Sequence, residues 1–175
     1  MKIIVNDANI LIDLVELQLL PNFFALKFEF YTTSLVFEEL EEDQQFTLKA
    51  YVEAGNLLVR EMTYKQLTEI NNIQKTKPAL SPQDCSAFYQ AQIEAGILIT
   101  SDNTLRKFAK AQNQEVHGHL WVFDRMFEAE TISGELAIIK LNELCQVINR
   151  NLGLPHDEWL FRSNGASDFG VIVPL

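Results

Sequence analysis

The chain has 175 residues, of which 47% are hydrophobic and 22% are charged, as in a folded globular protein and unlike a disordered one. Its 24 acidic and 14 basic residues give a net charge of −10, which argues against nucleic-acid binding through a broad basic surface. Two cysteines are too few for a disulfide framework, and no stretch has the roughly 18 uninterrupted apolar residues of a membrane span. Asp7, Asn9 and Asp13 also interrupt any secretion-signal core, so we expect a soluble cytoplasmic protein.

The first third of the chain alternates short apolar runs with helical patterns. We predict a buried strand at residues 2–6, a helix at 10–20 that Pro21 helps to end, a strand at 28–33 and a long helix at 35–54 with Gly55 beyond its end.

The same alternation continues to residue 152. We predict strands at 57–60, 97–100 and 116, and helices at 64–75, 81–95, 105–112, 120–128 and 133–152. Strands that alternate with helices imply crossover connections, so the expected fold is of the α/β class: a three-layer α/β/α sandwich around a mainly parallel sheet. Residues 1–152 are predicted to form this domain, and residues 153–175 a tail that packs on it or forms an interface.

Four acidic residues from distant segments are predicted to meet at one edge of the sheet. Asp7 follows the first strand and Asp102 follows the strand at 97–100, and ligands of open parallel sheets bind beyond these carboxyl ends. Asp84 lies in the first turn of one predicted helix and Glu39 in the first half of another. Gathered carboxylates repel one another unless a cation lies among them, and Mg²⁺ and Mn²⁺ prefer such oxygen ligands.

Each of these acids also has a purely structural explanation. Asp84 completes a capping box with Ser81, and Asp102 is in position to cap the following helix. Glu39 belongs to the charged run at 38–43, which is typical of a solvated helix face. No single acid makes the case for a metal site. That case rests on the occurrence of all four acids, in this order along the chain.

Histidines and aromatic residues in the second half of the chain offer no other site. His117 and His119 lack partners at zinc-ligand spacing and are expected in a turn or at the surface. Trp121, Phe123 and Phe127 on one helix favour a core or a homodimer face over base stacking.

The order of these segments resembles the PIN-domain family of metal-dependent nucleases, over roughly residues 2–135. The matching motifs are Asp7-Ala8-Asn9-Ile10-Leu11-Ile12, residues 34–40 ending in Glu38-Glu39-Leu40, residues 80–84, residues 98–102 followed by 105–109, and Val116-His117-Gly118. Either Glu38 or Glu39 fits the second acidic position, and we choose Glu39 because it precedes Leu40.

The resemblance implies a ribonuclease that cuts single-stranded RNA, often as the toxin of a toxin–antitoxin pair. It implies metal ligation, directly or through water, by Asp7, Asp84 and Asp102, with Glu39 holding a second ion or orienting the attacking water. Asn9 and Ser101 would be polar supports. Arg106, Lys107 and Lys110 follow Asp102 on one helix and would hold substrate phosphates.

Two other functions compete with this one. A haloacid-dehalogenase-type phosphatase also begins with an aspartate after its first strand, but it needs a second aspartate where this chain has Asn9. The net charge of −10 favours a catalytically inactive PIN-like interaction module, although an acidic surface also suits a basic antitoxin partner.

Overall fold

Residues 2–152 fold around a five-stranded sheet in which all strands are parallel. The computed structural model describes residues 2–152, so the predicted tail at 153–175 lies outside the described residues. The strands are β1 (Ile3–Asn6), β2 (Glu29–Thr33), β3 (Leu57–Arg60), β4 (Ile97–Ile99) and β5 (Val116–His117), in the order β3-β2-β1-β4-β5. This arrangement confirms the predicted α/β class with a parallel sheet.

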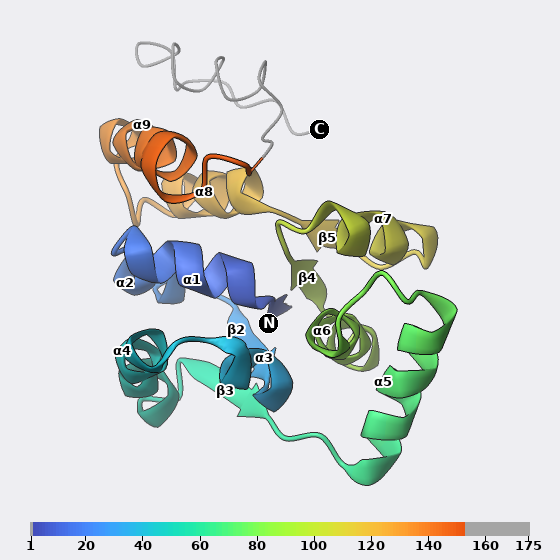
Figure 1. Ribbon diagram of the computed structural model, residues 1–175. Coiled ribbons are helices and arrows are strands. Elements are labelled where there is room, and N and C mark those ends of the chain that lie inside the picture. Colours follow the sequence, from blue (N-terminus) through green and yellow to red (C-terminus); the bar gives the residue numbers. More distant parts are fainter. Residues whose placement is uncertain (1, 153–175) are drawn as a thin grey trace.

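Helices cover both faces of the sheet, which gives the three predicted layers (Figure 1). On one side lie α1 (Ala8–Glu16), α2 (Leu20–Phe24), α4 (Glu42–Glu53), α8 (His119–Glu128) and α9 (Gly134–Glu143), and on the other α5 (Tyr64–Thr76), α6 (Pro82–Ile93) and α7 (Asn103–Ala111). The short helix α3 (Ser34–Glu39) follows β2 directly and packs against α6. Within residues 2–152, no helix combines the length and apolar character that crossing a membrane requires.

The centre of the sheet forms the core of the domain. Ile4, Val5 and Leu98 on β1 and β4 are fully buried, because helices cover both faces of these strands. Burying one such side chain contributes roughly 1.5–3 kcal/mol, so the two central strands are firmly fixed.

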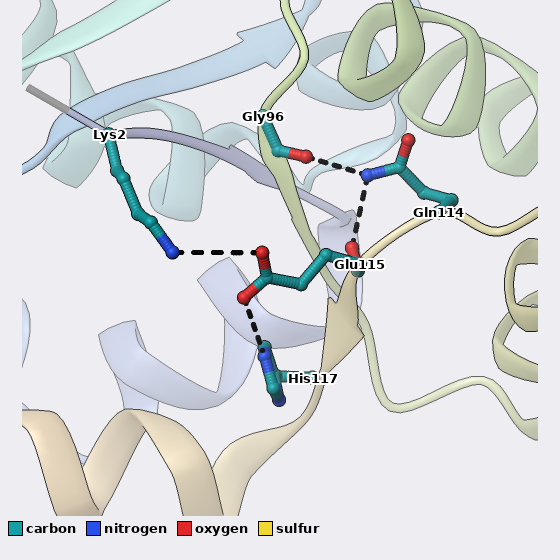
Figure 2. A network of polar contacts seen from close by, with 5 residues as sticks. All are labelled: Lys2, Gly96, Gln114, Glu115 and His117. Carbon is teal, nitrogen blue, oxygen red and sulfur yellow. Dashed lines mark hydrogen bonds and ion pairs between the residues drawn. The ribbon is translucent and has the colours of Figure 1, made fainter.

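A polar network ties together the starts of three strands, at the edge opposite to the carboxyl ends (Figure 2). Gln114 Nε2 donates to the carbonyl oxygens of Gly96, just before β4, and of Glu115, just before β5, at 2.6 and 3.0 Å. The Glu115 carboxylate lies 3.7 Å from Lys2 Nζ, just before β1, and 3.1 Å from His117 Nε2.

The predicted single helix at 35–54 is wrong, because the chain breaks at Leu40 into α3 and α4. Leu40 has an extended backbone with ψ of 147°. Gln44 Oε1 accepts from the Glu41 N–H at 3.0 Å, and Gln45 Nε2 donates to the Leu40 carbonyl at 2.8 Å. These two glutamines satisfy backbone groups that a continuous helix would have paired, and so stabilise the break.

Two other predicted helices also end early. The helix predicted at 10–20 stops at Glu16, since Gln18 takes a left-handed conformation with φ of 58°. Pro21 instead lies in the first turn of α2, where its missing N–H costs nothing. The helix predicted at 133–152 is regular only to Glu143 and continues as the π-helical turn η1 (Leu144–Ile148).

Candidate metal centre

The four predicted acids gather at the carboxyl ends of β1 and β4. The strand order reverses between these two strands, and such a reversal leaves a crevice at the carboxyl edge of an open sheet. Asp7 directly follows β1 and Asp102 is the N-cap of α7, just after β4. Asp84 is in the first turn of α6, and Glu39 is the last residue of α3. The negative charges of Asp84 and Glu39 both act on Asp7, and that of Asp102 acts on Asp84.

Asp7 is the most deeply buried of these acids, with 2% of its surface exposed. It is the N-cap of α1, where Oδ1 accepts from the Ala8 N–H at 2.9 Å and Oδ2 accepts from Thr100 Oγ1 at 2.7 Å. Burial raises the pKa of Asp7 from 3.8 to about 7, although the hydrogen bond from Thr100 acts in the opposite direction. At neutral pH this carboxyl group is therefore poised between its neutral and charged forms.

Thr100 joins two of the acids and was not among the residues predicted from the sequence. Its side chain is fully buried, and its hydroxyl donates to Asp7 and accepts from the Asp102 backbone N–H at 3.0 Å. The Asp102 carboxylate in turn accepts from the Leu105 N–H at 2.6 Å. A hydroxyl at the end of the strand next to β1 was the available signal. The neighbouring Ser101, which we expected as a support, is half-buried, and its side chain makes no hydrogen bond within residues 2–152.

Asp84 forms the predicted capping box with Ser81. The Ser81 N–H donates to Asp84 Oδ2 at 2.8 Å, and the Asp84 N–H donates to Ser81 Oγ at 3.0 Å. Burial raises the pKa of Asp84, the hydrogen bonds to Ser81 lower it, and the charge of Asp102 raises it further. In this cap the Ser81 N–H reaches Oδ2 of the Asp84 carboxylate, and the carboxylate faces the charge of Asp102.

Glu38 and Glu39 both lie on the exposed side of α3. Partial burial of the Glu39 carboxyl group raises its pKa, and so does the charge of Asp84. Glu39 is also among the charges that raise the pKa of Asp7. Glu39 therefore shares the electrostatic environment of the buried acids, even though its side chain reaches the surface.

The chemistry of these side chains fits a hard divalent cation. Within residues 2–152, no three His, Cys, Asp or Glu side chains are grouped closely enough to enclose a metal ion as they stand. The four acids nevertheless offer only oxygen donors, and Oδ2 of Asp102 accepts no hydrogen bond from the described residues. Mg²⁺ keeps several water ligands and needs only one or two carboxylates, so an open set of oxygens suits it better than it suits Zn²⁺.

Of the three predicted phosphate-binding residues, Arg106 lies closest to this edge. A Cβ atom added to Gly118, the N-cap of α8, would lie 3.3 Å from Arg106 Nη1 and 3.4 Å from the Thr100 carbonyl oxygen. Arg106 is half-buried there and makes no hydrogen bond or ion pair within the described residues. Lys107 and Lys110 are exposed on α7.

The other predicted support, Asn9, and the two histidines lie elsewhere. Asn9 is exposed in the first turn of α1, and its side chain makes no hydrogen bond to residues 2–152. The prediction that His119 lies at the surface is wrong: it is 2% exposed, with Nε2 2.9 Å from Asp13 Oδ2. Asn149 donates to the same Asp13 oxygen at 3.2 Å, so this group joins α1, α8 and the end of η1. His117 is half-buried, as a turn or surface residue can be.

Trp121 packs within its own chain. Its ring stacks on His117 with centroids 4.8 Å apart and contacts Phe28 at 5.9 Å. Phe123 is buried in the core, and Phe127 is half-buried. The homodimer face that these aromatic residues favoured stays a prediction.

Comparison with known proteins agrees with this fold. A family model described as a PIN domain matches residues 3–150. No curated protein matches the chain. Because the family model covers most of the sequence, the chain belongs to the PIN-domain family.

Proposed function

We propose that the protein is a divalent-metal-dependent endoribonuclease that hydrolyses phosphodiester bonds of single-stranded RNA. PIN domains are in general nucleases, and membership of that family supports hydrolysis of nucleic acid. The observation that carries the proposal is the Asp7 carboxyl group, which is buried, has a pKa of about 7 and lies within the field of Glu39 and Asp84. Burying an acid among other acids is costly unless its charge is used, and binding a cation uses it.

Mg²⁺ or Mn²⁺ would be held by Asp7, Asp84 and Asp102, with Glu39 at the exposed side of the site. A bound ion of this kind supplies an activated water and stabilises the leaving oxygen of the phosphodiester. Thr100 holds the Asp7 and Asp102 segments in place through its two hydrogen bonds. In this proposal Glu39 orients the attacking water by accepting its hydrogen bond.

The substrate would be held by a few local cations. Arg106 is the best placed of them, because it is half-buried, its guanidinium group lies near Gly118 at the start of α8, and it has no hydrogen-bond partner among the described residues. A planar guanidinium can bind a phosphate through two parallel hydrogen bonds. Lys107 and Lys110 would contact neighbouring phosphates. Asn9 and Ser101 are proposed as polar supports at the edge of the site.

A role as the toxin of a toxin–antitoxin pair belongs to the same proposal. The net charge of −10 suits a small basic antitoxin, which would cover the acidic site. A homodimer, a cytoplasmic location and a single domain over residues 1–152 are likewise proposed. The second candidate function is a catalytically inactive interaction module, which the net charge and the open spacing of the acids favour.

Cleavage of a labelled single-stranded RNA with EDTA, Mg²⁺ or Mn²⁺ tests the proposal. The wild-type protein is expected to cut only when a metal ion is present. The variants Asp7→Asn and Asp102→Asn are each expected to lose most of that activity. Glu39→Gln should lose more activity than Glu38→Gln, its matched neighbour on α3. Cleavage that survives EDTA, or that is unchanged in both aspartate variants, would contradict the mechanism. A wild type that cuts with neither ion would favour the interaction module.

A further inference from the structure

A buried pair of hydroxyl groups links the two helices that carry Glu39 and Asp84. Thr33 ends β2 and is the N-cap of α3, while Ser86 lies in the second turn of α6. Both residues are fully buried, and their side-chain oxygens are 2.7 Å apart. Because Thr33 precedes α3 directly, this contact fixes the start of α3 against α6.

The hydrogen bonds of this pair run in one direction. Ser86 Oγ donates to the carbonyl oxygen of Gln83 at 2.8 Å, and a carbonyl oxygen can only accept. Since Ser86 has a single hydroxyl proton, Thr33 must donate to Ser86. The Thr33 oxygen also accepts from the Val36 N–H at 3.2 Å, which caps α3. The chain of bonds thus ends at Gln83, the residue next to Asp84.

Helix formation alone does not account for Ser86. Alanine is the better helix former at an interior position, and an alanine at residue 86 would leave the cap of α3 by Thr33 intact. What the serine adds is a bond to another element of the fold. The helix α3 has six residues and so spans about 9 Å, with the pair near one end and Glu39 at the other.

We propose that Thr33 and Ser86 are positioning residues that hold the helices of Glu39 and Asp84 together at the proposed metal centre. The inference rests on the proposed function. Glu39 and Asp84 are both acidic, so their negative charges repel each other. Without the hydroxyl pair, α3 keeps its packing on α6 but loses the hydrogen bond that fixes its start, and the two carboxylates can separate.

Titrating the protein with Mn²⁺ alone and measuring the binding by calorimetry tests the proposal without RNA. Loss of a group that orients a metal ligand lowers metal affinity by about 10- to 100-fold, and we expect about tenfold for Ser86→Ala. Thr33→Val is expected to weaken binding by a similar factor, and Thr33→Ser, which keeps the hydroxyl, to restore it. The double variant Thr33→Val/Ser86→Ala should lose less Mn²⁺ affinity than the two single losses combined, because the Thr33–Ser86 bond is lost in all three variants.

Thr68→Val is the matched control. Thr68 donates to the Tyr64 carbonyl oxygen at 3.0 Å on the exposed side of α5, so its loss should leave Mn²⁺ affinity unchanged. Titrations are made at a temperature where every variant is folded, as checked by its melting curve in EDTA. If Ser86→Ala does not fold, Ser86→Cys keeps a side chain of the same shape, slightly larger and with a weaker donor, and is expected to bind Mn²⁺ less tightly.

The outcomes separate the two proposals. Wild-type affinity in the Ser86 variant would overturn the positioning role and leave the proposed function standing. Equal weakening in Thr33→Ser and Thr33→Val would also overturn it, because the hydroxyl would then not be the cause. A wild type that binds no Mn²⁺ would overturn both the metal-dependent function and this inference.

Discussion

Replacing Asp7 with asparagine is expected to stabilise the protein at high pH in the absence of metal. The pKa of Asp7 is raised from 3.8 to about 7 in the folded state. Between these two values the folded protein holds a proton that the unfolded chain has released, so the free energy of unfolding falls as the pH rises. The full penalty for the buried charge is present above about pH 7, and it vanishes below about pH 4.

The size of the effect follows from the shift and from the bonds that asparagine can keep. The difference between 3.8 and about 7, at about 1.4 kcal/mol for each pH unit, corresponds to roughly 4 kcal/mol. Asparagine caps helices as well as aspartate does. Its single oxygen, however, can accept from either the Ala8 N–H or the Thr100 hydroxyl, and losing one of these bonds costs about 1–2 kcal/mol. We therefore expect Asp7→Asn to be about 2–3 kcal/mol more stable at pH 8.5.

Urea unfolding in EDTA at pH 5, 7 and 8.5 measures this difference, because every other titrating group is common to the two proteins. At pH 5 the charge penalty is only about 1.6 kcal/mol and nearly cancels the lost hydrogen bond. The gap between the two proteins should therefore be close to zero at pH 5 and should open towards pH 8.5. A gap that does not change with pH, or a less stable variant at pH 8.5, would refute the burial of an ionisable Asp7.

Three further changes test the surroundings of this carboxyl group. Thr100→Val removes the hydrogen bond that lowers the pKa of Asp7, so the carbon-13 NMR titration of that carboxyl should move above about pH 7; an unmoved midpoint would contradict the contact. Gly118→Ala brings a methyl group to 3.3 Å from Arg106 Nη1, so the guanidinium must shift slightly; the KM for RNA should rise roughly twofold, about 0.4 kcal/mol of phosphate binding, with Mn²⁺ affinity unchanged. Arg106→Lys keeps the charge but loses the paired donors, and it should raise the KM more than Lys107→Ala does; equal values would remove Arg106 from the substrate site.

The fold could be predicted from the sequence wherever one physical pattern dominates. Strands buried on both faces show as apolar runs, so 97–100 was predicted within one residue of β4 (Ile97–Ile99). The break between α3 and α4 could not be predicted in this way. Residues on both sides of Leu40 favour helix, and the break depends on the side chains of Gln44 and Gln45, which pair with backbone groups only once the turn exists.

The candidate site was predictable to a similar degree. Asp7 and Asp102 follow strands, and the parallel order of the sheet brings such positions to one edge. Thr100 was missed because a single threonine at a strand end has many common roles. The contact of Thr33 with Ser86 joins residues 53 positions apart, and only the packing of α6 on the sheet brings them together.

The way in which the acids are held explains why this edge of the sheet should favour a cation. Asp7, Asp84 and Asp102 each accept hydrogen bonds from uncharged donors, which are backbone N–H groups and the hydroxyl of a threonine. Such donors fix the carboxylates in space but do not cancel their charges, and the pKa of Asp7 rises to about 7 as a result of burial and of the neighbouring acids. An ion pair with Arg106 would have cancelled part of this charge. Arg106 instead lies against Gly118 and makes no ion pair within residues 2–152. The repulsion that remains can be relieved by a divalent ion, so Mn²⁺ should raise the melting temperature of the wild type more than that of Asp7→Asn.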